Sequence, residues 1–268
     1  MINLEQLCKD VCQLTQDVGG FIKHELGAFN VNAIEIKGKN DFVSYVDKKA
    51  EAMLCASLSQ MLPTAGYYAE EGTSTLIGDV YNWVIDPLDG TTNFIHGLPI
   101  FAISVALMRN EEVILGVVHE INFNETFYAW ENSSAYLNST VILPSKISTL
   151  NGALIATGFP YSDFTQLDSY LHFLTFLLKE TNGVRRFGAA SVDIAYVACG
   201  RFDAFYEYGL KPWDVAAGAF ILKQAGGKVS DFQGGSNFIF GKELIACNPS
   251  IYSEFHRQFT SYFKPTPR

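Results

Sequence analysis

Two aspartates, Asp86 and Asp89, end an apolar run in the stretch WVIDPLDGTTNF, residues 83–94. Pro87 has no backbone N–H to donate to a sheet, so we expect the apolar run to form a strand that ends there. Both carboxylates then lie at the C-terminal end of a strand, where open α/β sheets commonly bind ligands. Carboxylates this close repel each other unless a cation such as Mg²⁺ lies between them, and the Leu88 carbonyl offers it a further ligand. A solvated Asp-Pro turn explains the same residues without a metal.

The next residues, Gly90, Thr91 and Thr92, supply consecutive backbone N–H groups at the predicted start of a short helix. Such groups bind phosphate without any basic side chain. A phosphate held there would also reach a metal bound by Asp86 and Asp89. A structural alternative is that a threonine hydroxyl caps the helix, which is compatible with the same geometry. The stretch therefore predicts a metal site joined to a phosphate site.

Further acidic positions fit this chemistry. Glu70 and Glu71 precede a glycine in a predicted loop, where paired glutamates are usually just solvated. Asp214 lies in the first turn of a predicted helix, a common place for aspartate on structural grounds alone. Glu207 ends a predicted strand and is equally open to a structural interpretation.

The length and composition of the chain favour a globular protein of the size of an enzyme. Its 268 residues are 48% hydrophobic and 18% charged, enough for one large domain or two closely packed ones. The net charge of -9 disfavours a nucleic-acid surface, and an anionic substrate would need local cations or backbone dipoles. Five scattered cysteines predict neither a disulfide framework nor a zinc site. The longest apolar run, residues 100–108, is too short to cross a bilayer, and the N-terminus predicts an amphipathic helix rather than a signal peptide, so we expect a cytoplasmic, unanchored protein.

The elements that must position these residues change in type along the chain. Residues 1–142 are expected to form an α+β half and residues 143–268 an α/β half, packed as one unit. The first half is predicted to hold helices over 4–26 and 46–62, a hairpin within 34–47, and strands over 81–85, 100–108, 113–120 and 125–130. The second is predicted to alternate strands at 153–157, 183–188, 202–207 and 228–232 with helices at 167–180, 191–200 and 214–227.

Taken together, these motifs resemble those of the inositol monophosphatase family of metal-dependent, lithium-sensitive sugar phosphatases. Residues 86–94, DPLDGTTNF, look like the family's first signature, and residues 213–227, WDVAAGAFILKQAGG, look like its second. Residues 41–51, 69–72 and 187–207 also match in order and approximate spacing. The resemblance spans most of the chain and implies a layered αβαβα sandwich that is usually a homodimer.

The resemblance also implies a set of metal ligands. Glu70, Asp86 and the Leu88 carbonyl would hold a first Mg²⁺. Asp86, Asp89 and Asp214 would hold a second. A third, weaker ion would lie near Glu70, so that two to three ions serve each active site.

Roles in binding and catalysis follow from the same resemblance. Thr91 would act with Glu70 to orient and deprotonate a metal-bound water that attacks phosphorus in line, as in the general two-metal scheme. The amides of Gly90 and Thr91 would hold the phosphate. Lys37 and Asp47 would belong to a mobile N-terminal hairpin, with Asp47 near the third metal. The residues that would meet the polyol are Asp89, Ala190 through its backbone, Glu207 and Asp214.

The leading functional hypothesis is Mg²⁺-dependent hydrolysis of a small polyol phosphate, with inositol 1-phosphate as the named substrate. Fructose-1,6-bisphosphatase and histidinol-phosphatase relatives share the metal set. Relatives that cleave 3'-phosphoadenosine 5'-phosphate usually carry Lys where this chain has Thr92. The chain departs from the family pattern at residues 130–140, which puts a local turn and a possible dimer contact in doubt. Because some relatives bind the transcription machinery, an interaction protein is the alternative from another class.

Overall fold

Seven strands form the larger sheet of the computed structural model, which describes residues 2–27, 35–38, 41–43, 45–74, 76–161 and 163–263. The strands lie in the sheet in chain order, and only the first pair is parallel. Asn110, with a φ of 57°, forms the tight turn between the third and fourth strands, a conformation that asparagine tolerates. In chain order the strands are β3 (Gly66–Ala69), β4 (Tyr81–Asp89), β5 (Ala102–Arg109), β6 (Glu112–Glu120), β7 (Glu125–Trp130), β8 (Tyr136–Leu137) and β9 (Thr140–Val141).

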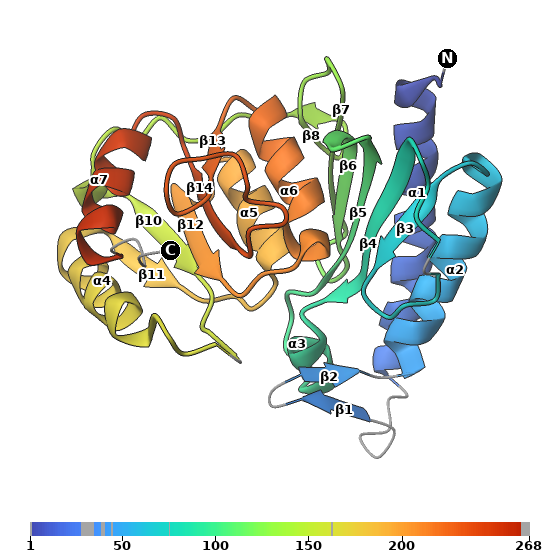
Figure 1. Cartoon of the computed structure of the whole chain (residues 1–268), viewed down its shortest axis with the longest axis horizontal. Coiled ribbons are helices and arrows are strands. Elements are labelled where there is room, and N and C mark those ends of the chain that lie inside the picture. Colours follow the sequence, from blue (N-terminus) through green and yellow to red (C-terminus); the bar gives the residue numbers. More distant parts are fainter. Residues whose placement is uncertain are drawn as a thin grey trace.

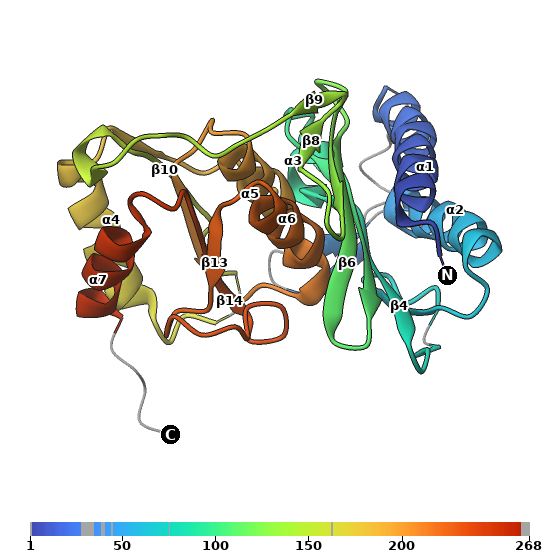
Figure 2. The same cartoon turned by 90° about the horizontal axis from the view of Figure 1, so that it is seen from above.

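Two helices, α1 (Leu4–Leu26) and α2 (Tyr45–Met61), cover one face of this sheet, as Figures 1 and 2 show. Apolar residues at helical spacing in α1, such as Val11 and Ile22, share one buried core with Trp83 of β4. Both predicted N-terminal helices are confirmed. No described helix combines the length and apolarity needed to cross a membrane.

The smaller sheet has five strands and mixed directions. The strands β11, β10 and β12 run parallel to one another, whereas β14 is antiparallel to both of its neighbours. The helices expected between the strands of this half supply the parallel crossovers. In sheet order the strands are β11 (Gly183–Arg185), β10 (Leu154–Thr157), β12 (Ala204–Tyr208), β14 (Glu243–Cys247) and β13 (Lys228–Ser230).

Helices cover both faces of the smaller sheet. On its outer face, α4 (Leu167–Glu180) and α7 (Tyr252–Tyr262) enclose an aromatic core in which Phe173 meets Phe255 edge to face, with ring centroids 5.5 Å apart. The strand β14 and the helix α7 were not predicted, although β14 buries an apolar run and α7 buries Phe255 and Phe259 at helical spacing.

The helices α5 (Ala190–Ala198) and α6 (Pro212–Gln224) lie between the two sheets (Figures 1 and 2). Helix α6 packs closely against the larger sheet, because a Cβ on Gly116 of β6 would lie 2.8 Å from the carbonyl oxygen of Ala217 in α6. Helix pair, sheet, helix pair, sheet and helix pair therefore follow one another. This arrangement confirms the predicted αβαβα sandwich.

Strand β4 corrects one expectation. The strand was predicted to end at Pro87, but β4 continues to Asp89. Its pairing with β5 shifts register between Asp86 and Asp89, so a bulge accommodates the residue that cannot donate to the ladder. The two aspartates therefore flank a bulge rather than following the strand.

The predicted N-terminal hairpin is present as the antiparallel pair β1 (Glu35–Gly38) and β2 (Asp41–Val43). Its turn at residues 39–40 and the side chain of Lys37 lie outside the described residues. The larger sheet ends at Val141 and the smaller begins at Leu154. The division into halves at residue 142 stays a prediction.

Candidate active site

The two aspartates of the bulge in β4 are both buried, with Asp86 2% exposed. The backbone N–H of Leu88 donates to Asp86 Oδ1 over 2.9 Å, which folds the turn between them. Asp89 reaches the other half of the chain, because its Oδ2 accepts from the backbone amide of Ser191 at 2.8 Å and from its hydroxyl at 2.6 Å. The end of β4 is thereby joined to the start of α5.

The predicted carboxylates lie close enough to Asp86 to raise its pKa. Burial raises the pKa of Asp86 well above its usual value, and the negative charges of Glu70, Asp89 and Asp214 raise it further. A hydrogen bond with Glu70 adds to the effect. Residues from β4, from the loop after β3 and from α6 therefore meet around the buried Asp86, with Glu70 and Asp214 themselves half-buried.

The pKa values of the other two aspartates are shifted in the same direction. Burial raises the pKa of Asp89 to about 6, and the hydrogen bonds from Ser191 limit that rise. Burial and then the charge of Asp89 raise the pKa of Asp214 well above its usual value. The backbone N–H of Lys211 donates to Asp214 Oδ2 at 2.7 Å, which opposes the shift and caps the start of α6.

The chemistry of these donors fits a hard divalent cation. All of them are carboxylate or carbonyl oxygens, as Mg²⁺ prefers, and a cation would relieve the repulsion that raises their pKa values. Within the ranges that the structure describes, no three histidine, cysteine, aspartate or glutamate side chains stand at the spacing of a metal site. A cation would have to replace the hydrogen bond between Glu70 and Asp86.

A buried glutamate that the sequence did not single out holds the loop of Glu70. The two carboxylate oxygens of Glu51, in α2, accept from the backbone amides of Glu71 and Thr73, each at 2.7 Å. The amide of Glu70 itself donates to the carbonyl of Ile85 at 3.2 Å. The loop is thus fixed between α2 and β4.

The predicted phosphate turn begins with Gly90, whose φ of 93° lies in the left-handed region. The short helix α3 (Thr91–Ile95) follows, as predicted, and no side chain caps it, so the proposed threonine cap is wrong. The Thr91 hydroxyl lies 3.0 Å from both Asp47 Oδ1 and the Leu88 carbonyl oxygen. This hydroxyl therefore sits between α2 and the bulge in β4.

Glu207, at the end of β12, contributes a further buried carboxylate. Burial raises its pKa to about 8; Arg186 lowers it and Asp89 raises it. The carboxylate packs directly on Gly158, where a Cβ would lie 1.9 Å from Glu207 Oε2. Ala190 begins α5 and directly precedes Ser191, which donates to Asp89. Two of the predicted polyol contacts, Glu207 and Ala190, therefore lie near Asp89.

A hydrogen bond between the larger sheet and α6 was also not predicted from the sequence. The hydroxyl of Ser104, in β5, donates to the carbonyl of Trp213 over 3.0 Å and holds the start of α6 against the larger sheet. Ser191 and Gly158 were also not predicted, because their contact partners, Asp89 and Glu207, are distant from them in sequence. The only available signal was that Ser191 falls inside the matched segment 187–207.

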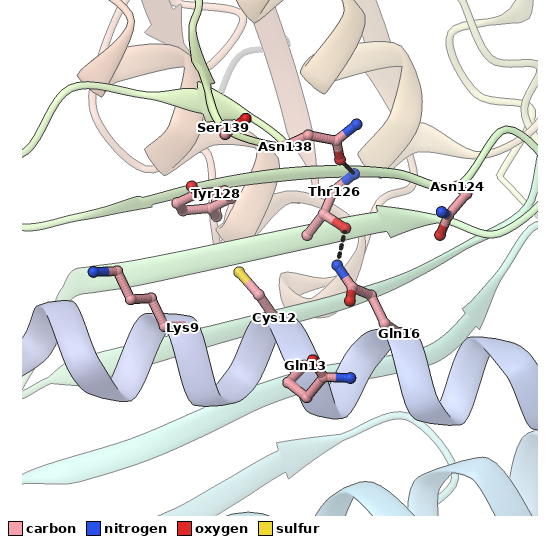
Figure 3. Close-up of a pocket in the computed structure, with 9 residues that line it drawn as sticks. All are labelled: Lys9, Cys12, Gln13, Gln16, Asn124, Thr126, Tyr128, Asn138 and Ser139. Carbon is pink, nitrogen blue, oxygen red and sulfur yellow. Dashed lines mark hydrogen bonds between the residues drawn. The ribbon is translucent and has the colours of Figure 1, made fainter.

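A separate polar hollow of about 450 Å³ lies between α1, β7 and the β8–β9 turn (Figure 3). Gln16 donates to the Thr126 hydroxyl at 3.1 Å, and the Thr126 amide donates to Asn138 Oδ1 at 3.0 Å. None of the predicted site residues lines this hollow.

The chain belongs to the inositol monophosphatase family, whose model matches residues 3–264. It is 40% identical to the Nus factor SuhB of Pseudomonas aeruginosa over 256 residues, 94% of each chain. It resembles the crystal structure of the extragenic suppressor protein suhB from Bartonella henselae with a TM-score of 0.89 and 36% identity, over 95% of this chain and 98% of that one. The Thermotoga maritima IMPase gives a TM-score of 0.87 and 36% identity, over 96% and 98%.

Proposed function

We propose that this protein is a Mg²⁺-dependent hydrolase of small polyol phosphates, with inositol 1-phosphate as its first candidate substrate. The observation that carries the proposal is the convergence of Glu70, Asp86, Asp89 and Asp214 in one mutually repelling cluster around the buried side chains of Asp86 and Asp89. Such an arrangement costs stability unless a cation or a substrate uses it. Family membership supports the same activity.

In this proposal Glu70, Asp86, the Leu88 carbonyl, Asp89 and Asp214 hold two to three Mg²⁺ ions. Bound there, Mg²⁺ would supply positive charge for the phosphoryl oxygens and would lower the pKa of a bound water. Hydrogen bonds from Ser191 to Asp89 and from the Lys211 amide to Asp214 would keep these two ligands in place before substrate arrives.

Thr91 and Glu70 would prepare the attacking water. The Thr91 hydroxyl is oriented by Asp47 and by the Leu88 carbonyl, so its oxygen can accept a hydrogen bond from a water. Glu70 is the nearby carboxylate that would accept the proton of that water. The two residues would thus fix the direction of attack.

Substrate binding would divide between backbone and carboxylate groups. The N–H groups of Gly90 and Thr91 would hold the phosphate, which compensates for the scarcity of basic side chains. The polyol hydroxyls would donate to carboxylates and to one backbone group around the ring. These contacts would be Asp89, Ala190, Glu207 and Asp214.

Phosphate release tests the activity and ranks its substrates. The substrates are inositol 1-phosphate, fructose 1,6-bisphosphate, histidinol phosphate and 3'-phosphoadenosine 5'-phosphate, each with and without Mg²⁺. Asp79→Asn is a matched control for the buried aspartates, because Asp79 is exposed and lies outside the cluster. Release that requires Mg²⁺ supports the proposal. No release from any substrate by folded, Mg²⁺-loaded protein rejects it.

A role as an interaction partner of the transcription machinery is the second candidate, favoured by the similarity to proteins named Nus factor SuhB. The test is a pull-down from native lysate with wild type and with Asp86→Asn. A binding role predicts that transcription proteins are retained by both forms. We also propose that the protein is a cytoplasmic homodimer, which sedimentation of the purified chain and fractionation of cells would test.

A further inference from the structure

A pair of cysteine thiols lies beside the polar hollow of Figure 3. Cys8 and Cys12 are one turn apart on the buried face of α1, and Cys12 lines the hollow. Figure 3 shows the Cys12 sulfur directed from α1 toward β7. The Cys8 side chain is completely buried, and its Sγ lies 3.8 Å from the carbonyl oxygen of Ala129 in β7. Both thiols therefore lie between α1 and β7.

The two thiols are close enough to act on each other. A hydrogen bond with Cys12 and then burial raise the pKa of the Cys8 thiol far above its usual value. Burial, and then the charges of Cys12 and Cys8, raise the pKa of the Tyr128 hydroxyl, which belongs to the same hollow. Both cysteines are free thiols. Two sulfur donors are thus available at one place.

The helical spacing of the pair favours a bridging ion over a disulfide. Cβ atoms one helical turn apart are separated by about 5–6 Å, whereas a disulfide requires about 3.5–4.5 Å. A direct bond between Cys8 and Cys12 would therefore distort α1. An ion bonded to both sulfur atoms spans a longer separation, because two bonds replace one.

The type and number of ligands limit which ion fits. Thiolates prefer soft ions such as Cu(I) and Zn²⁺. A structural zinc site needs four ligands. No third histidine, cysteine, aspartate or glutamate completes a metal site with this pair in the part of the chain that the structure describes. Cu(I) is stable with two sulfur ligands, so the pair suits it better than it suits zinc.

The charge of the hollow also suits such a complex. One monovalent cation with two thiolates carries a net charge of -1. Among the described residues that line the hollow, Lys9 alone is charged, and its charge favours the thiolate form of Cys8. Lys9 also pairs with Glu5 at 2.6 Å, but both side chains are more than half exposed, so this pair is weak. The other lining residues are neutral and would not repel an anionic complex.

We infer that Cys8 and Cys12 form a two-thiolate site for a soft monovalent cation such as Cu(I), which enters from the polar hollow. On binding, both S–H bonds break, two Cu–S bonds form and two protons pass to the solvent, with no change in the oxidation state of copper. The site goes beyond the proposed phosphatase and is independent of it, because none of the predicted site residues lines the hollow.

The test is a competition for Cu(I) between the full, reduced protein and the chromophoric chelator bicinchoninate, without oxygen. Wild type should withdraw copper from the chelator until each chain holds one ion. Cys8→Ala and Cys12→Ala should each lower the affinity at least about tenfold, because one of the two sulfur ligands is lost. Cys55→Ala is the matched control, since Cys55 is a buried helical cysteine that does not line the hollow. It should bind copper as wild type does.

Two further measurements keep the result independent of folding defects. The Tm of each copper-free variant shows whether it folds. X-ray absorption at the copper edge of loaded wild type should show two sulfur neighbours and no nitrogen or oxygen ligand. Lys9→Gln keeps both thiols and changes only an exposed side chain. It should bind the same amount of copper with an affinity about two- to fivefold lower, because a nearby positive charge is removed.

Distinct results overturn distinct parts of the inference. Full affinity in Cys8→Ala or Cys12→Ala, or an equal loss in Cys55→Ala, would reject the location of the site. Copper with three or more ligands would reject two-thiolate binding. Zn²⁺ bound as tightly as Cu(I) would reject the choice of a soft monovalent cation. None of these outcomes bears on phosphate release.

Discussion

The carboxylate of Asp89 accepts two hydrogen bonds from Ser191, one from its amide at 2.8 Å and one from its hydroxyl at 2.6 Å, across 102 residues of sequence. Both residues are buried. The pair joins the bulge of the larger sheet to the helix layer between the sheets. An aspartate proposed as a metal ligand is therefore aimed by the other half of the chain.

Replacing Ser191 with alanine should weaken catalysis without removing a ligand. We expect kcat/KM to fall roughly tenfold, because a hydrogen bond to a charged group is lost and Asp89 is less firmly aimed. Phosphate release at saturating Mg²⁺ measures the effect. Ser59→Ala is the control, since Ser59 is exposed on α2. Equal rates in wild type and Ser191→Ala would remove this positioning role.

Neutralising the central carboxylates should separate activity from stability. Asp86→Asn, Asp89→Asn and Asp214→Asn should each lower turnover by orders of magnitude. The Tm of the metal-free protein should stay the same or rise, because each change removes one of several repelling carboxylates around Asp86. Turnover near that of wild type in any variant would exclude that residue from the proposed metal set.

Gly158→Ala should disturb Glu207 selectively. The new methyl group would lie 1.9 Å from Glu207 Oε2, so the carboxylate must move. We expect a loss of about 1–3 kcal/mol in the free energy of unfolding and a larger rise in KM for inositol 1-phosphate than for phenyl phosphate. Gly20→Ala is the control, because nothing lies within 4 Å of its Cβ position in α1, and it should stabilise the protein slightly. Unchanged KM values for both substrates would contradict the contact between Glu207 and the polyol.

Mg²⁺ should stabilise the protein more at pH 8 than at pH 5.5. The pKa values of Asp86, Asp89, Asp214 and Glu207 are all raised by burial, to about 6 for Asp89 and about 8 for Glu207. The metal-free folded state therefore holds protons that the unfolded chain has released, and its stability falls as pH rises from about 4 to above 8. A metal competes with those protons. The difference in Tm with and without Mg²⁺ at the two pH values is the measurement, and an equal difference at both would contradict the account.

Protonation of His119 should lower the stability of the protein as pH falls, whereas the carboxylates lower it as pH rises. Burial lowers its pKa to about 4, and its Nδ1 lies 3.0 Å from the Thr126 hydroxyl. The folded state then resists a proton that the unfolded chain accepts, so stability is lost as pH falls from about 6.5 towards 4, by about 3 kcal/mol at most. His119→Gln should flatten that part of a denaturation profile. A profile identical to that of wild type would show that His119 does not control acid stability.

Local patterns predicted most elements because each buries one face against a layer. The apolar spacing of α1 and the run before Asp86 are set by neighbouring residues, so one sequence was enough to find them. The bulge at Pro87 was missed because its cause is pairing with β5, not the proline alone. The contacts of Ser191 and Gly158 were missed because they depend on how the sheets and helices are layered, which periodicity does not encode.

The most direct test of the central claim is phosphate release from inositol 1-phosphate with Mg²⁺, measured for wild type, Asp86→Asn and the exposed control Asp79→Asn. The account predicts release by wild type and by Asp79→Asn that disappears when Mg²⁺ is removed and is reduced by orders of magnitude in Asp86→Asn. Release that continues without Mg²⁺, or that Asp86→Asn retains in full, would contradict it.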